Sequence, residues 1–431
     1  MSKPFSSLRL DRRSLLRGAG AVLAAGLARR LLPSVANAAA GDGTANLFFA
    51  GTDGWISLPR APALGAFHPD NLAPDPFTTY IFGFRNITGL NETQISQQKL
   101  KAQHSAPLFW IDQYDGSNEF KLDLTNLGLG IRPDLVDSHT VHYHGFRNVI
   151  PFFDGEPTTS VSVPVGRVFR YIYRPRDPGT YMFHCHVEDV EHVHMGMTGL
   201  VFVRPLQNGN TALYPSGKYA YNDGNGSTGF DREFALFLSE IWAEAHWADS
   251  HIQLPEWSDY RADFALLNGR VYPDTLAPNG SIDPFHPVRD ASGDLIAPPG
   301  FPHLQYQPHS ALVRCNAGER VLLRFANLGF KEAAMTLAGL KMRVVGKDAT
   351  LMRGRDGTDT SFETDSVSFG AGESIDAIFT APAVSSPTTF VLYNRSFRRS
   401  NNRDGSGDGG QRTEVRVYPA GTLPPQQVPN T

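Results

Sequence analysis

The chain is organised around one stretch, Gly179-Thr-Tyr-Met-Phe-His-Cys-His-Val-Glu-Asp-Val-Glu-His-Val-His-Met-Gly-Met197. The segment from Tyr181 to His186 follows a run of strand-forming residues, and we expect it to be extended. Successive side chains of a strand point to opposite faces, so His184 and His186 share one face and Cys185 points to the other. A thiol and a pair of imidazoles are therefore held back to back on one strand.

The thiol has candidate partners for a metal. A cysteine, two histidines and a weakly bound methionine form a blue copper electron-transfer site. The same stretch offers Cys185, His192 and Met197. The remaining histidine lies upstream, in Asp137-Ser-His-Thr-Val-His-Tyr-His-Gly-Phe146, where His139 is the candidate.

The upstream segment repeats the split between two faces. His142 and His144 are two residues apart and share a face of an extended chain, whereas His139 has the opposite parity. We therefore expect His139 to join Cys185, and His142 and His144 to join the histidines on either side of that cysteine. The two segments together predict two metal centres, one on each side of the same pair of strands.

These motifs resemble the copper signature of the multicopper oxidases: His-x-x-His-x-His-Gly, then His-Cys-His, a later His and Gly-Met. The resemblance implies a blue copper bound by His139, Cys185, His192 and axial Met197. It also implies that four histidines form half of a trinuclear copper cluster, namely His142, His144, His184 and His186. The family usually has three residues before the next histidine, but here five intervene, Val187 to Glu191. We place the insertion before His192, and His194 is the competing ligand.

Length and composition limit the possible classes of protein. The chain has 431 residues, enough for two or three domains, and its formal net charge of −4 gives no polycationic surface for nucleic acid. Its 41 glycines and 31 prolines favour many turns and short strands. There are only two cysteines, so no disulfide framework is expected if Cys185 binds metal, and Cys315 is expected to be a buried thiol.

The first residues resemble a twin-arginine signal peptide. Asp11-Arg-Arg-Ser-Leu-Leu-Arg17 is followed by a small apolar run, and Ala36-Asn-Ala38 is a plausible cleavage site. The apolar run is too short for a membrane span. We therefore expect residues 1–38 to direct export and the mature protein to be periplasmic or extracellular.

The remaining chain predicts an all-β fold of two tandem cupredoxin-like Greek-key β-sandwich domains. Alternating apolar and polar residues predict strands, and the segments resemble successive multicopper oxidase segments. We expect a copper-binding domain at 39–205, a linker at 206–231, a second domain at 232–420 and a tail at 421–431.

The second domain lacks the ligands that the family pattern implies. Where the family has histidines, the chain reads Met335-Thr-Leu-Ala-Gly339 and Val391-Leu-Tyr-Asn-Arg395, and no histidine follows His309. We expect this domain to be structural. The segment from Arg395 to Arg412 is expected to be a long loop whose arginines are solvated.

The resemblance implies a trinuclear cluster bound by eight imidazoles, four from each of two domains. This chain offers four at the matching positions. A second chain could supply the rest, the site could hold fewer metals, or it could be degenerate.

The leading hypothesis is a secreted, laccase-like multicopper oxidase that takes single electrons from a small-molecule reducing substrate and reduces O2, assembled as a homo-oligomer. One alternative is a copper nitrite reductase, but such enzymes have an Asp where His142 stands and a non-ligand where His186 stands. The other is a non-catalytic electron carrier or copper-binding envelope protein.

Overall fold

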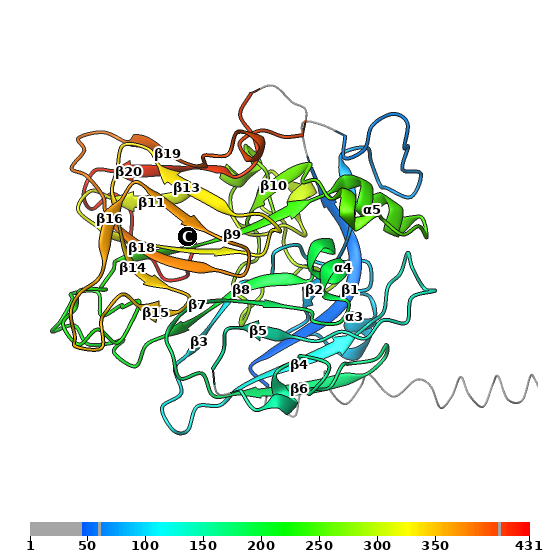
Figure 1. Cartoon of the computed structure of the whole chain (residues 1–431), viewed down its shortest axis with the longest axis horizontal. Helices are drawn as coiled ribbons and strands as arrows, with labels where there is room; N and C mark the ends of the chain where they lie inside the picture. Colours follow the sequence, from blue (N-terminus) through cyan, green and yellow to red (C-terminus); the bar gives the residue numbers. More distant parts are fainter. Residues whose placement is uncertain (1–44, 59–61, 148, 404–406) are drawn as a thin grey trace, which may run out of the picture.

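The computed structural model describes residues 45–58, 62–147, 149–403 and 407–431. The predicted signal peptide, residues 1–38, lies outside these residues. The described chain forms four β-sheets arranged as two sandwiches that lie side by side (Figure 1). No helix among the described residues is long and apolar enough to cross a membrane. The prediction of an all-β chain with tandem cupredoxin-like sandwiches is confirmed.

The first sandwich packs two four-stranded sheets face to face. One sheet has the order β2 (Thr78–Asn86), β1 (Leu47–Ser57), β4 (Phe120–Asn126) and β6 (Val168–Tyr173). The other has the order β3 (Phe109–Asp112), β8 (Thr198–Arg204), β7 (Gly179–His184) and β5 (His142–His144). Aromatic side chains fill the space between them, with the ring of Phe109 5.6 Å from that of Phe49 and 5.2 Å from that of Phe183. This core fixes β7, the strand that leads into Cys185.

The second sandwich is larger but follows the same plan. Its seven-stranded sheet contains β10 (Phe264–Leu267), β9 (Arg232–Ile241), β12 (Arg320–Asn327), β18 (Ser374–Thr380), β14 (Met342–Lys347) and β15 (Thr350–Leu351), with β16 (Phe362–Thr364) paired to β14. Its five-stranded sheet contains β11 (Val313–Asn316), β20 (Arg412–Tyr418), β19 (Thr388–Asn394), β13 (Ala333–Leu337) and β17 (Ser366–Phe369). A separate apolar core, which includes Cys315, lies between these sheets.

In the described part of the chain, three short α-helices accompany the sheets: α3 (Glu92–Ser96), α4 (Asp189–Met195) and α5 (Ala243–Ser250). The five residues after the His-Cys-His motif, Val187 to Glu191, lead into α4 and form its first turn. The residue that caps its start, Glu188, has a left-handed φ of 45°, and the residue that caps its end, Gly196, has a φ of 119°, a conformation that favours glycine. A Cβ at position 196 would also lie 2.8 Å from the Phe82 carbonyl oxygen, so the end of α4 is held tightly against β2.

A buried polar network joins the two sandwiches. Arg324 of β12 is fully buried and lies 3.0 Å from Glu233 and 3.5 Å from Asp376. The Thr180 hydroxyl of β7 donates to Asp376 at 2.6 Å, so the network reaches the strand of the first sandwich that precedes the histidines. Asn430, in the predicted tail, bonds to both backbone groups of Ala235 in β9. The sandwiches therefore hold a defined relation to one another.

Candidate metal centres

The pairing of β5 with β7 brings the two histidine motifs together. His142 lies opposite His184 in an antiparallel register, and His144 lies opposite Met182. Directly after β7, the backbone N–H of Cys185 donates to the Met197 carbonyl at 3.0 Å. The register therefore brings the upstream motif and both ends of the downstream stretch to one end of the sheet.

The first candidate centre is a buried group of one cysteine and two histidines. One potential ligand atom from each of His139, Cys185 and His192 lies within 4.8 Å of the other two, and all three residues are fully buried. The Cys185 Sγ is 3.3 Å from His192 Nδ1. Met197 is also fully buried. Both the His139 ring and the Met197 Cε lie against Gly51 of β1, where a Cβ would be only 2.6 Å from His139 Cδ2 and 3.4 Å from Met197 Cε.

The charges in this centre favour a thiolate. Burial alone would raise the pKa of Cys185, but the positive charge of His192 and contacts with His139 and His192 hold it well below its usual range. Burial likewise acts to lower the pKa of His192, but Cys185 and Asp137 raise it to about 10. The thiolate is the form of cysteine that binds metals.

Unpaired buried nitrogens show that these residues fit a copper ion. Neither ring nitrogen of His139 has a hydrogen-bond partner among the described residues, and His192 presents its Nδ1 to the thiol while its Nε2 faces Asp137. A buried polar atom without a partner is unfavourable, and a ligand bond to a metal removes that penalty. Soft sulfur together with imidazole is the donor set of blue copper sites. The backbone N–H of Thr140 lies 3.4 Å from Sγ, in a position to stabilise the thiolate.

The second candidate centre is the histidine group on the opposite face of the strands. Potential ligand atoms of His142, His144 and His184 lie within 4.8 Å of one another. The His186 ring is placed alongside, 5.0 Å from the His142 ring and 5.4 Å from the His184 ring between centroids. The structure thus brings all four predicted histidines together, with three of them in the closer group.

Hydrogen bonds prepare two of these histidines to bind a metal. The Nδ1 of His142 lies 2.7 Å from the Asp154 carbonyl oxygen, and that of His184 lies 2.8 Å from the Cys185 carbonyl oxygen. A carbonyl only accepts, so each Nδ1 carries the proton and each Nε2 keeps a lone pair for a metal. Burial lowers the pKa of His142 and His144 and brings that of His184 to about 3, so the imidazoles stay neutral.

The second sandwich approaches this histidine face without adding an imidazole. A Cβ at Gly372, in the turn before β18, would lie 3.1 Å from His144 Nε2. At the predicted ligand positions, the Thr336 hydroxyl lies 2.7 Å from the Ser366 hydroxyl, and Asn394 donates to Gln411 at 2.8 Å. Within the part of the chain that the structure describes, every group with the spacing of a metal site lies in the first sandwich.

The structure separates the two histidines that compete for the first centre. His192 faces Cys185, whereas His194 points from α4 towards the second sandwich and its Nε2 accepts from the Trp242 backbone N–H at 3.0 Å. Sequence reasoning missed Asp137, whose Oδ2 lies 3.5 Å from His192 Nε2, and the close approach of Gly51. The parity of Asp137 relative to His139 was the available hint, since both have the same parity in an extended segment.

Comparison with known proteins agrees with this geometry. Two family models described as multicopper oxidase match residues 125–208 and 248–419, together more than half of the chain. No curated protein matches the sequence. The fold resembles a blue copper oxidase from Nitrosomonas europaea, at 18% identity and a TM-score of 0.55 over 86% of this chain and 85% of that one. It also resembles the multicopper oxidase mgLAC, at 19% identity and a TM-score of 0.57 over 88% and 87% of the two chains.

A copper nitrite reductase from Nitrosomonas europaea is similar too, at 14% identity and a TM-score of 0.51 over 89% of this chain and 97% of that one. At such identities the likeness to solved structures concerns the fold alone, and the family assignment rests on the two matching family models. The chain belongs to the multicopper oxidase family and is a copper-dependent oxidoreductase.

Proposed function

We propose that the protein is a laccase-like oxidase that takes single electrons from a small-molecule reductant and reduces O2. His139, Cys185, His192 and Met197 would hold a blue copper, and His142, His144, His184 and His186 would hold a copper cluster. Bound copper would supply one-electron chemistry at the first centre and oxygen chemistry at the second. The chain itself fixes the ligands, excludes water from the first centre and keeps the imidazoles of His142, His144 and His184 neutral.

One observation carries this proposal: the two candidate centres share the tripeptide His184-Cys185-His186. The Cys185 Sγ belongs to the first centre, while the rings of both neighbours belong to the second. The bond from His184 Nδ1 to the Cys185 carbonyl oxygen adds a 2.8 Å link between the centres. This is the connection needed to gather single electrons at one site and use several at another.

The histidine group favours oxygen over nitrite as the acceptor. The resemblance to nitrite reductases implies an Asp at the position of His142 and a non-ligand at that of His186. Here both are imidazoles, with ring centroids 5.0 Å apart. A group of four imidazoles suits more than one copper ion better than a single ion does.

The open side of the histidine group supports an oligomer. His144 is exposed, and the turn of the second sandwich that approaches it at Gly372 carries no imidazole. A symmetric partner subunit would be the simplest source of further ligands, since most oligomers are closed and symmetric. We also propose export by the twin-arginine route to the periplasm or the exterior, because residues 1–38 have that pattern.

Copper counting combined with oxygen uptake tests the function. We expect more than one copper per chain, a blue colour, and oxygen consumption with a phenol or dye that depends on assembly. Nitric oxide from nitrite, without oxygen uptake, would instead indicate a nitrite reductase. One copper per chain with no turnover would indicate an electron carrier.

A further inference from the structure

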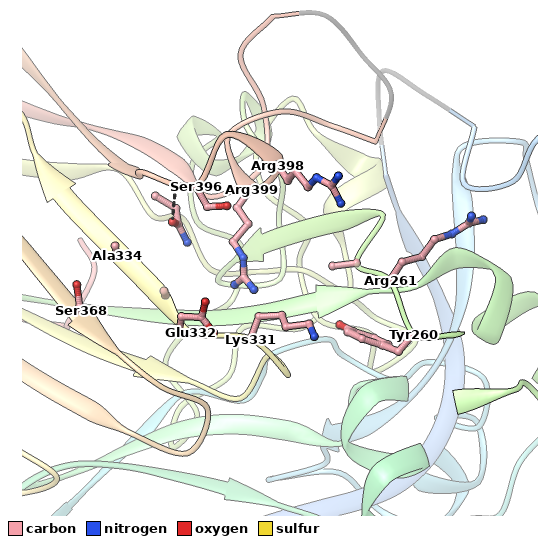
Figure 2. Close-up of a pocket in the computed structure, with 12 residues that line it drawn as sticks. Tyr260, Arg261, Lys331, Glu332, Ala334, Ser368, Ser396, Arg398 and Arg399 are labelled. Carbon is pink, nitrogen blue, oxygen red and sulfur yellow. Dashed lines mark hydrogen bonds between the residues drawn. The ribbon is translucent and has the colours of Figure 1, made fainter. Parts of the chain in front are cut away.

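The second sandwich contains a cationic pocket away from both candidate centres (Figure 2). Its volume is about 510 Å³, within the range of small-molecule sites. Four cations line it, Arg261, Lys331, Arg398 and Arg399. Arg261 pairs with Glu244 at 3.2 Å and Arg399 with Glu240 at 2.6 Å, which leaves Lys331 and Arg398 against Glu332. The excess of positive charge indicates an anionic ligand.

Arg399 is the best-built donor in this pocket. It is 7% exposed, and its Nη2 lies 2.6 Å from Glu240 Oε1. Its Nη1 is buried and has no hydrogen-bond partner among the described residues. The expectation that the arginines of this loop are solvated is therefore wrong for Arg399, because η5 (Phe397–Arg399) folds it inward. A buried guanidinium donor without an acceptor is unfavourable, and an anion in the pocket would supply the acceptor.

The remaining walls suit an aromatic ligand. The Tyr260 hydroxyl donates to Glu240 at 2.6 Å, so its hydrogen is already used. The Lys331 ammonium lies 5.8 Å from the centre of the Tyr260 ring and forms no ion pair within the described residues. Ala333 and Ala334 provide an apolar floor beside these polar groups. In Figure 2 the Arg399 guanidinium and the Lys331 ammonium point into the same space as the Tyr260 hydroxyl.

The pocket is connected to the first metal centre by packed rings. The rings of Tyr260 and Phe330 each lie 5.3 Å from the His194 ring and 5.0 Å from one another. His194 is in α4, two residues from His192. Because His139, Cys185 and His192 are fully buried, an electron must reach them through surrounding protein, and these rings form one such path.

We propose that this pocket binds small aromatic carboxylates and that, given the oxidase function proposed above, carboxylate-bearing phenols are its reducing substrates. The carboxylate would accept hydrogen bonds from Arg399 and Lys331, and the ring would pack on Tyr260 and the alanines. Each phenol loses one electron to the buried centre and its hydroxyl proton to solvent, and leaves as a phenoxyl radical.

Calorimetry on copper-free protein tests binding independently of turnover. The probes are 4-hydroxy-3-methoxybenzoate and 2-methoxyphenol, the same ring without the carboxylate. We expect the anion to bind at least about tenfold more tightly, since charge-assisted hydrogen bonds are the strong ones. Lys331→Gln and Arg398→Gln should each weaken anion binding about three- to tenfold and leave the neutral phenol unchanged. Both positions are exposed, so these variants should fold.

Lys341→Gln is the matched control, because it removes the same charge from an exposed lysine. Lys341 lies beyond the opposite end of β13 from Lys331. Equal binding of the two probes, or equal weakening of anion binding by Lys331→Gln and Lys341→Gln, would overturn the proposal that this pocket binds the carboxylate. Oxygen uptake by the copper-loaded protein then separates the two proposals. Failure to oxidise either phenol would refute the oxidase function while calorimetry still decides the pocket. Oxidation of the anion with a KM that Lys331→Gln leaves unchanged would refute the pocket as the substrate site.

Discussion

The two sandwiches of this protein contain the same kind of antiparallel strand pair, but only the pair in the first sandwich carries histidines. In the first, β5 and β7 pair so that His142 lies opposite His184. In the second, β13 and β19 pair in the same antiparallel sense, with Met335 opposite Asn394. The second sandwich keeps its own apolar core and its hydrogen-bonded sheets although the ligand positions are vacant of imidazole. The fold therefore rests on apolar packing, and the metal ligands are an addition to it.

At the ligand positions, the treatment of polar atoms distinguishes the two sandwiches. In the second sandwich, Thr336 and Asn394 have found local partners at 2.7 and 2.8 Å. In the first, the ring nitrogens of His139 are buried without partners. Buried polar atoms are normally satisfied, so the unpaired nitrogens of His139 beside a buried thiol fit a place built for a metal.

Removing the thiol should give the largest effect. We expect Cys185→Ser to abolish the blue colour of copper-loaded protein completely, because serine cannot replace a soft thiolate. Visible absorption checks the colour, and copper counting should show that the histidine group still binds metal. A variant that stays blue would exclude Cys185 as a ligand.

Removing imidazoles from the second centre should show which property depends on which centre. We expect His142→Ala with His186→Ala to lower oxygen uptake at least about 100-fold, since even outer partners of metal ligands contribute 10–100-fold. The blue colour should remain, because neither side chain reaches Cys185 Sγ. Thr336→Ala, at the corresponding place in the second sandwich, is the control and should leave oxygen uptake unchanged. Undiminished turnover in the double variant would contradict the assignment of this centre.

The neighbouring histidines of α4 offer a sharper comparison within one helix. His192→Ala should bleach the blue colour, whereas His194→Ala should keep it and lower the free energy of unfolding by about 2 kcal/mol, because the buried Trp242 N–H loses its acceptor. Absorption and denaturant unfolding of both variants check this. The opposite pattern of colour would mean that α4 presents His194 to the thiolate.

Sequence parity was enough to predict which histidines share a face with which, because the period of a strand is two residues. It could not reveal the partners that come from distant segments. Gly51 lies on β1, and the Asp154 carbonyl that orients His142 belongs to a turn, so neither carries a local pattern. The burial of Arg399 was missed for the same reason, since its partner Glu240 is far away in the chain.

Two further histidines, between the sandwiches, are buried but lack the spacing of a metal site. His104 and His246 are buried, and burial lowers their pKa to about 3 and about 4. His104 is lowered further by His246, and a hydrogen bond to the Tyr80 carbonyl partly opposes the effect in His246.

The sign of their effect on stability follows from proton binding. Below the ordinary histidine pKa of about 6.5, the unfolded chain takes up protons that the native protein cannot accept, so stability is full above that pH and falls as the pH drops towards 4. Each histidine should lower the free energy of unfolding by about 1 kcal/mol per pH unit in this window. Denaturant unfolding at pH 7, 6 and 5 should therefore show a shallower pH dependence in His104→Gln than in the wild type. The metal ligands are the same in both proteins, so their own pH dependence cancels in the difference. Parallel curves would contradict the lowered pKa, because they would mean that His104 binds its proton in the native protein as readily as in the unfolded chain.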